Sequence, residues 1–240
     1  MISSLVFFVL LAITSVAFYI RVKTITSNIN LGRDIEISDN PSLRWKTMAR
    51  VALGQSKMVT RPVAGFMHIL IYLGFIIINL EILEIILDGL FGTHRIFSEF
   101  LGGLYKPFIN SFEVLAVGVL VACVVFLARR NVLKLKRFWS KEMTSWPKSD
   151  ANIILIVEIL LMTAFLTMNA ADSILLNTPP LELGRFSLEH YTGVDMNNSG
   201  FVVSQLIVPL LPSDFTSLAF IERACWWFHI VGIFAFLNYV

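Results

Sequence analysis

The sequence has little charge, and this scarcity excludes a water-soluble protein of ordinary composition. Charged residues make up 15% of its 240 positions, whereas hydrophobic residues make up 56%, and the mean hydropathy is +0.75. Soluble domains carry about 25% charged residues, so lipid is the expected solvent. The net charge of +2 gives no indication of a nucleic-acid partner.

Cysteine is scarce as well. The two cysteines, Cys123 and Cys225, lie inside apolar runs and share no CxxC or other ligand spacing. This pattern argues against a disulfide framework and against a cysteine-ligated metal site. We expect both side chains to fill small apolar gaps.

Long apolar stretches are abundant. Five of them cover residues 2–20, 63–90, 108–128, 151–171 and 217–240, and each approaches the ~20 residues that a helix needs to cross a bilayer. The first lacks the basic start and the cleavage site of a signal peptide, since it runs into Arg21. The sequence therefore predicts an all-α integral membrane bundle of five transmembrane helices.

Basic residues are distributed unevenly over the connections. Eight of the nineteen lie between the first and second stretches, seven lie between the third and fourth, and three lie in the other two connections. Because loops rich in Lys and Arg stay in the cytoplasm, the N-terminus is predicted outside and the C-terminus in the cytoplasm.

Two connecting segments are predicted to lie at the membrane surface. Residues 43–55 alternate basic and apolar side chains at near-helical spacing, which predicts a helix on the inner face. Residues 200–212 are apolar, closed by prolines and too short to span, so they are expected in the outer interface or tucked partly inward.

Two of the four histidines, His68 and His229, fall in the second and fifth stretches. An imidazole in hydrocarbon needs a partner, and two facing imidazoles can ligate the iron of a b-type haem. Gly65 and Gly232 each lie three residues from one of them, on its helical face, where a flat porphyrin would approach. The alternative is that each imidazole bonds to protein groups and that the glycines serve helix packing.

The expected depths of these two histidines differ by ~8 Å at 1.5 Å per residue, which either helix tilt or separate haems would explain. The other two, His94 and His190, are predicted to be solvated residues of outer loops, because neither lies in a motif with metal-ligand spacing.

Acidic residues also fall inside the apolar stretches. Glu81, Glu84 and Asp88 recur at i, i+3 and i+7 and share a face near the outer end of the second helix. We predict that headgroup water wets Glu84 and Asp88, whereas Glu81 is a candidate proton acceptor beside an outer quinol site. Glu158 is predicted to face the bundle, either in an inner proton path or paired with a buried donor.

Two short motifs carry a resemblance to a known family. They are residues 52–68, with Ala-Leu-Gly-Gln-Ser-Lys and Arg-Pro-Val-Ala-Gly-Phe-Met-His, and Trp-Trp-Phe-His at 226–229. These stretches resemble the membrane part of heterodisulfide-reductase-like, electron-transfer-flavoprotein-linked iron-sulfur oxidoreductases, which is similar to the gamma subunit of respiratory nitrate reductase. The resemblance implies that His68 and His229 ligate haem b.

The resemblance also implies partners. Members of this family pass electrons between menaquinone and a cytoplasmic domain with [4Fe-4S] clusters, which often faces an electron-transfer flavoprotein, in the cytoplasmic membrane of bacteria or archaea. That domain is expected after residue 240, so we expect the chain to be the membrane fragment of a longer protein. Nitrate reductase gamma subunits hold two haems with four histidines, whereas the second stretch here has Asn79 and no second histidine, which leaves one haem or two.

The predicted function is thus a quinone-linked electron-transfer module. A cofactor-free proton-coupled transporter or proton-conducting subunit is one alternative, built on Glu81, Glu158 and the intramembrane histidines. A passive membrane anchor that recruits a partner through its basic loops is another.

Overall fold

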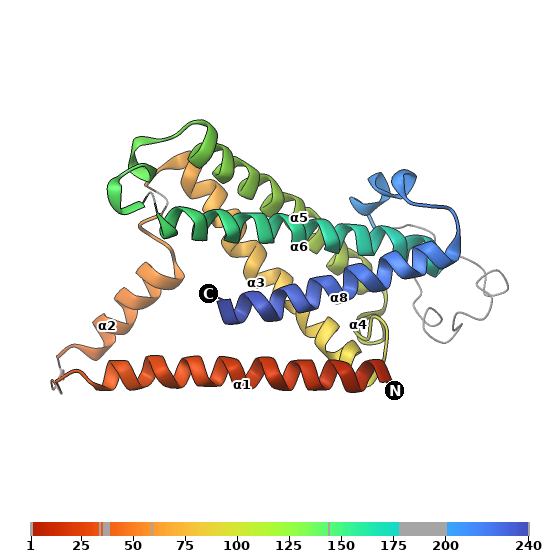
Figure 1. The fold of residues 1–240 in the computed structure, drawn as a ribbon, viewed down its shortest axis with the longest axis horizontal. Coiled ribbons are helices and arrows are strands. Elements are labelled where there is room, and N and C mark those ends of the chain that lie inside the picture. The colour runs from red at the N-terminus through yellow and green to blue at the C-terminus, as the bar shows by residue number, and fades with distance from the viewer. Residues whose placement is uncertain are drawn as a thin grey trace.

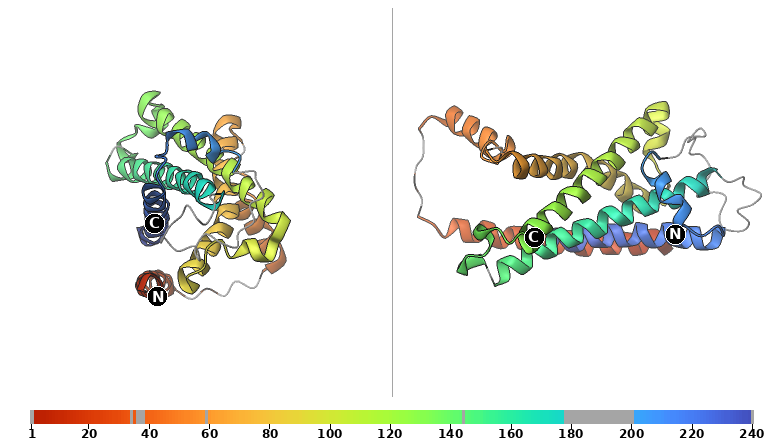
Figure 2. Two further views of the ribbon diagram at one scale, coloured as in Figure 1. Left: turned by 90° about the vertical axis from the view of Figure 1, so that its right-hand side faces the viewer. Right: turned by 90° about the horizontal axis from the view of Figure 1, so that it is seen from above.

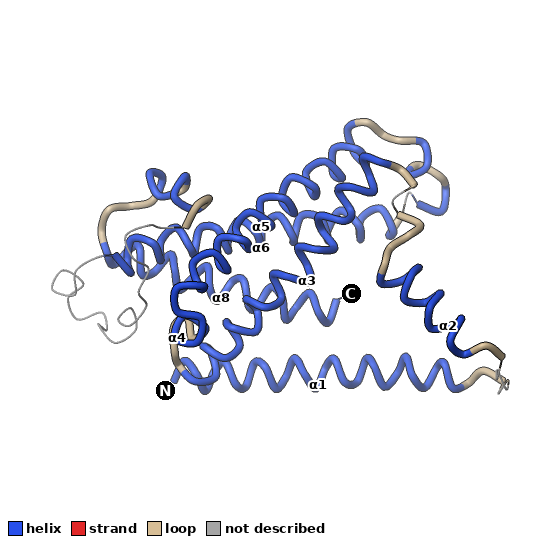
Figure 3. The backbone as a smooth tube through the Cα atoms, turned by 180° about the vertical axis from the view of Figure 1, so that it is seen from behind, coloured by secondary structure: helices blue, strands red, loops and turns tan. Residues whose placement is uncertain are grey.

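The computed structural model describes residues 2–33, 35, 39–58, 60–143, 145–177 and 201–239, and this part of the chain contains helices and loops but no strand (Figure 3). Five of its helices are long and apolar enough to cross a membrane. They are α1 (Ile2–Asn30), α3 (Pro62–Phe91), α5 (Tyr105–Leu127), α6 (Trp146–Asn177) and α8 (Phe215–Tyr239). The predicted fold class is confirmed.

Most helices extend beyond the apolar stretches that predicted them. α1 continues past residue 20 to Asn30, and α6 begins at Trp146 rather than at residue 151. Hydropathy marks only the part of a helix that suits hydrocarbon, whereas backbone hydrogen bonding continues until a residue breaks it. α3 agrees most closely with its prediction, because Pro62 begins it and Gly92, in the left-handed conformation with φ +73°, ends it.

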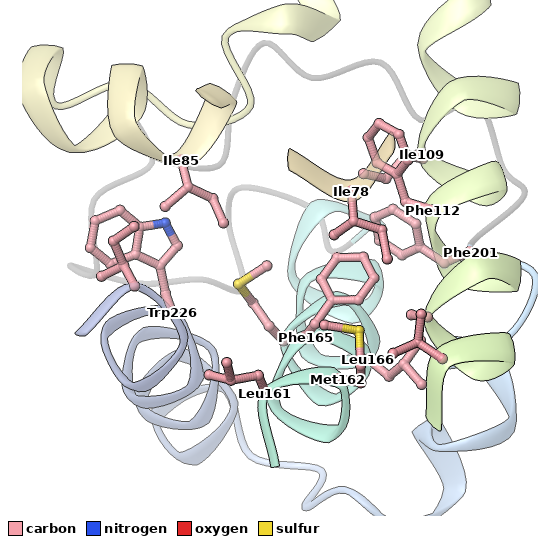
Figure 4. Packing of buried hydrophobic residues seen from close by; sticks show 14 of the residues in the cluster. Ile78, Ile85, Ile109, Phe112, Leu161, Met162, Phe165, Leu166, Phe201 and Trp226 are labelled. Atoms are coloured by element: carbon pink, nitrogen blue, oxygen red, sulfur yellow. The ribbon is translucent and has the colours of Figure 1, made fainter. Parts of the chain in front are cut away.

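The core lies where α5, α6, α8 and α3 meet. α6 packs along α8 and against α5, and α5 also packs on α3 (Figure 1). Phe165 of α6, Ile78 of α3 and Trp226 of α8 belong to one hydrophobic cluster (Figure 4). Cys123 and Cys225 are free and pack in this cluster, as expected of small apolar side chains.

α1 lies at the edge of the bundle (Figure 2) and contacts α3 and α8. Its fully buried Phe7 meets the rings of Trp226, Trp227 and Phe234 at centroid distances of 5.6, 6.3 and 6.1 Å. Most of the other large apolar side chains of α1 are exposed, as expected of a helix that faces lipid.

Both basic connections lie at the same end of the bundle, away from the N-terminus (Figure 1). The first contains α2 (Pro41–Met48) and a π-helical turn, Ala49–Leu53; the second contains the π-helical turn Ala128–Val132 and the 3-10 turns Lys136–Phe138 and Lys141–Met143. No side chain of α2 or of Ala49–Leu53 is buried. The helix predicted at residues 43–55 is confirmed, because α2 and the turn that follows it cover most of this range. Its position on the inner membrane face stays a prediction.

The opposite end is called the outer end here, after the predicted orientation. It holds α4 (Phe97–Leu101), the 3-10 turn Gly102–Leu104 and, in the segment from residue 201, the 3-10 turns Ser204–Leu206 and Val208–Leu210. Phe201 and Ser204 are fully buried, whereas Leu206 and Leu210 are exposed. Of the two predicted placements, the structure thus shows the one in which the segment tucks partly inward.

Candidate functional site

An apolar cavity of about 320 Å³ lies among α3, α5, α6 and α8. Its volume falls at the lower end of the range for small-molecule sites, about 300–1,000 Å³. Three polar side chains reach the otherwise apolar lining: Asn79, Glu158 and His229. An apolar cavity on which a few polar groups converge is the usual form of a binding site.

His229, which lines this cavity, has one of its two ring nitrogens bound to the protein. The residue is 2% exposed, and its Nδ1 lies 3.1 Å from the carbonyl oxygen of Leu161 of α6. Because a carbonyl oxygen only accepts hydrogen bonds, Nδ1 carries the proton and the lone pair of the neutral ring lies on Nε2. Metal-ligating histidines have this arrangement, with one nitrogen held by a protein acceptor and the other free to bind.

His68 is half-buried in α3, one turn away from the cavity toward the basic connections. It shares a helix face with the cavity-lining Ile71, Phe75 and Ile78, and the helix rises only ~4.5 Å between His68 and Ile71. The structure therefore places His229 in the lining and His68 on a bordering face. Haem ligation by either residue stays a prediction.

The two glycines occupy different surroundings. Gly65 is buried in the first turn of α3. Gly232 faces α6, because a side chain there would lie 2.7 Å from Cδ2 of Leu161. Gly232 thus allows close packing of α8 on α6, and the predicted role of both glycines beside a porphyrin stays a prediction.

Glu158 of α6 faces the bundle interior as predicted, since it lines the cavity. Asn79 of α3 lines the cavity as well, and its Nδ2 donates to the carbonyl oxygen of Phe75. The amide oxygen is the acceptor that Asn79 can offer to a ligand.

A second group of polar side chains is buried at the outer end, around Arg95. The guanidinium donates to Oδ2 of Asp172 at 2.7 Å, to Oδ1 of Asn169 at 2.6 Å and to the hydroxyl of Tyr105 at 3.3 Å, and it lies 5.0 Å from the ring centroid of Phe201. Burial alone would lower the pKa of Arg95, but Tyr105 and the neighbouring carboxylates raise that pKa well above its ordinary value. Arg95 is therefore a permanent buried cation.

Two acids of α3 hold the turn that follows it. Asp88 accepts hydrogen bonds from the backbone N–H groups of Arg95 and Ile96 at 2.8 and 3.2 Å, and Glu84 accepts one from Phe97 at 2.9 Å. Glu84 and Asp88 are 2% and 8% exposed. The prediction that headgroup water wets them is wrong, because the chain folds back over the helix end and its N–H groups take the place of water.

His94 is also buried rather than solvated. Its Nε2 lies 3.0 Å from Oδ1 of Asp172, and its side chain is 8% exposed. The prediction of a solvated loop residue is wrong for His94, because α6 brings Asp172 against it from 78 residues away in the sequence. His190 lies outside the described residues.

Glu113 of α5 joins this network to the segment after residue 200. It is fully buried, and its Oε2 accepts hydrogen bonds from the backbone N–H groups of Val203 and Ser204 at 2.7 and 3.2 Å. Its Oε1 accepts from Nδ2 of Asn169 at 3.1 Å and from the hydroxyl of Ser204.

Glu81 shares the buried face of Glu84 and Asp88, as predicted. Its Oε1 has no hydrogen-bond partner among the described residues, and NH1 of Arg95 lies 4.0 Å away. Beside it is a small cavity of about 20 Å³, also lined by His94 and Glu222. In the described part of the chain, no three His, Cys, Asp or Glu side chains are grouped so that they could hold a metal ion.

Sequence reasoning missed several members of the network. Glu113 and Glu222 fall inside predicted membrane stretches, where an ionisable residue is itself a sign of a buried polar site, and this signal could have found them. Arg95 and Asp172 lie in predicted connections, so neither gave a local signal.

Comparison with known proteins shows a distant likeness. The chain is similar to a probable iron-sulfur-binding oxidoreductase, FadF, of Bacillus subtilis (strain 168), with 24% identity over 238 residues that cover 99% of this chain and 30% of the relative. The chain thus spans about 30% of the length of that relative. No family model and no solved structure matches. The five membrane-length helices indicate a multi-pass membrane protein. The likeness indicates a distant relation to an oxidoreductase.

Proposed function

We propose that this chain is the membrane electron-transfer part of an iron-sulfur oxidoreductase. It exchanges electrons with menaquinone in the bilayer and with a cytoplasmic iron-sulfur domain, which faces a soluble partner such as an electron-transfer flavoprotein. The likeness to a relative described as iron-sulfur-binding supports the redox part of this proposal. The [4Fe-4S] clusters belong to the iron-sulfur domain and not to these 240 residues, whose two cysteines are too few to hold one.

His229 is the observation that carries the proposal. Its Nε2 lone pair, fixed by the hydrogen bond from Nδ1 to Leu161, belongs to a ring that lines an apolar cavity. In this proposal His229 and His68 would hold a b-type haem. When bound, such a haem supplies one-electron transfer, since two imidazoles leave no open position for oxygen.

The remaining residues have supporting roles in this proposal. The apolar lining from α3 and α8 keeps water from the cavity. In this proposal Glu158, at the same cavity, exchanges protons with the inner side of the membrane. Glu81 accepts a proton from quinol oxidation at the outer end each time it has passed on the proton that it holds.

The test is an absorption spectrum of the detergent-purified, full-length gene product. We expect a b-type alpha band after reduction with dithionite. His229→Ala and His68→Ala should each remove or shift the band, because each variant lacks one of the two imidazoles that would hold the haem iron.

His190→Ala is the matched control, since it removes an imidazole predicted to lie outside the membrane, and it should leave the band unchanged. Gel-filtration elution and the thermal unfolding midpoint show whether each variant is folded. A colourless wild-type protein that is folded by these measures contradicts the proposal.

A proton-coupled transporter without a cofactor is the second candidate, and the excess of buried acids at the outer end favours it. A colourless folded protein whose vesicles acidify or take up a solute in a Glu81-dependent way would identify this function. A colourless protein without such activity would instead identify a membrane anchor.

A further inference from the structure

The network at the outer end holds more acidic groups than cations. Six carboxyl side chains are buried there: Glu81, Glu84, Asp88, Glu113, Asp172 and Glu222. Among the residues that the structure describes, the cations that contact these carboxyl groups are Arg95, Arg223 and, when protonated, His94. Because a buried carboxylate without a compensating cation or donor is expensive, at least one of these groups is expected to carry a proton.

The hydrogen bonds identify Glu81 as the group without donors. Glu84, Asp88 and Glu113 each accept a backbone N–H hydrogen bond, as described above. Glu222 accepts two hydrogen bonds from Arg223, at 2.5 and 2.7 Å. Oε1 of Glu81 is buried and accepts none from any described residue.

The cavity beside Glu81 is large enough for one water molecule. Its volume of about 20 Å³ exceeds the ~10–15 Å³ that a water requires. A buried water also needs two to four polar partners, and the lining offers the side chains of Glu81, His94 and Glu222 among others.

We propose that Glu81 is a neutral carboxylic acid bound to one ordered water in this cavity, and that this water passes the proton of Glu81 to His94 at the outer end of the bundle. In this step the O–H bond of the carboxyl group breaks and an N–H bond of the imidazole forms. Arg95, 4.0 Å from the carboxyl oxygen, compensates the charge left on Glu81.

The chemistry of its side chain and its position in the structure suit His94 to accept this proton. A neutral imidazole has a ring nitrogen that can accept a proton, whereas the guanidinium of Arg95 has no acceptor and cannot be deprotonated in a protein. The side chain of His94 lines the cavity, retains 8% exposure and lies in the turn between α3 and α4. The inference rests on the proposed function for the origin of the proton, but the site itself requires no redox cofactor.

Infrared spectroscopy of the purified full-length protein tests the protonation state. The spectrum of the wild type minus that of Glu81→Gln should show the carbonyl stretch of a neutral carboxyl group. Glu142→Gln, which replaces an exposed glutamate, should give no such band. Isotopic labelling of glutamate carboxyl carbons in the wild type must shift the same band, so the measurement does not depend on the folding of Glu81→Gln.

Hydrogen–deuterium exchange of this band tests the route. His94→Gln keeps a donor for Asp172 but cannot take up a proton, so exchange in deuterated buffer should slow about tenfold or more, within the range that a positioned acid–base group contributes. His190→Gln should exchange at the wild-type rate.

Three results would overturn the proposal. The first is a wild-type spectrum without the band. The second is loss of the band on adding sodium ions, which would mean that a cation neutralises the site. The third is an equal exchange rate in the wild type and His94→Gln. Haem absorbance of the same samples tests the proposed function separately, because the infrared band does not depend on the haem.

Discussion

Arg95 fills a position at the outer end that a lysine could not fill. Its planar fork reaches Asp172, Asn169 and Tyr105 together, whereas lysine carries a single point charge. Its backbone N–H also bonds to Asp88. One residue therefore ties α3, α5 and α6 together at the level where the chain turns.

Replacing this cation should destabilise the protein strongly. Arg95→Ala leaves Asp172 buried without its guanidinium, and removing one partner of a buried ion pair costs about 3–5 kcal/mol. We expect a fall of this size in the free energy of unfolding, measured by denaturant titration in detergent. Arg50→Ala removes the same charge from an exposed position at the other end and should change stability by less than about 0.5 kcal/mol. Equal losses in the two variants would contradict this account.

At the residue scale, the sequence indicated some of the ionisable side chains that are buried in the membrane part, but it did not indicate which residues they would contact. His229 and Glu81 stood out because ionisable side chains are rare in hydrocarbon, and both are buried in the structure. The burial of His94 and Glu84 was not predictable, since their partners come from the later Asp172 and from a chain reversal at Phe97. Such contacts arise only when the helices pack.

At the scale of elements, one of the close contacts of α1 with the bundle lies at Gly89 of α3. A side chain at Gly89 of α3 would lie 2.6 Å from the ring of Phe7, so the glycine is what allows the ring to lie against the α3 backbone. Membrane helices without water between them associate mainly through packing of this kind.

Gly89→Ala should therefore weaken the attachment of α1 to α3. Overpacking of this kind costs about 1–3 kcal/mol, measured as a lower thermal stability or as faster proteolysis at residues 31–40. Gly103→Ala is the matched control, because nothing lies within 4 Å of a side chain built there. Adding Phe7→Leu to Gly89→Ala should restore part of the loss, and a double variant weaker than both single variants would refute the contact.

Hydropathy predicted the five long helices, and the reason is physical. Each span is a continuous apolar run, and α3 has a proline at its start and a glycine after its end. The same signals could not predict the course of residues 201–212, because the backbone of Val203 and Ser204 is held by Glu113 of α5. Side-chain contacts between distant segments fix that shape.

At the scale of the whole molecule, the two proposed sites lie at different depths. The apolar cavity reaches the last turns of α8, whereas the polar network occupies the outer end. The proposed function would put electron exchange toward the basic connections and proton release at the other end. This assignment of the two ends depends on which side of the membrane each end faces.

The predicted orientation rests on the basic connections and can be tested by cysteine labelling. In a background with Cys123→Ala and Cys225→Ala, we expect a membrane-impermeant maleimide to label Ser213→Cys in intact cells, because Ser213 is exposed at the outer end. Ser42→Cys, exposed on α2 among the basic residues, should react only after the membrane is opened. Each site is the control for the other. The reverse pattern would direct His94 to the cytoplasm and remove the cytoplasmic docking of an iron-sulfur domain, so both the direction of proton release and the proposed partner would be wrong.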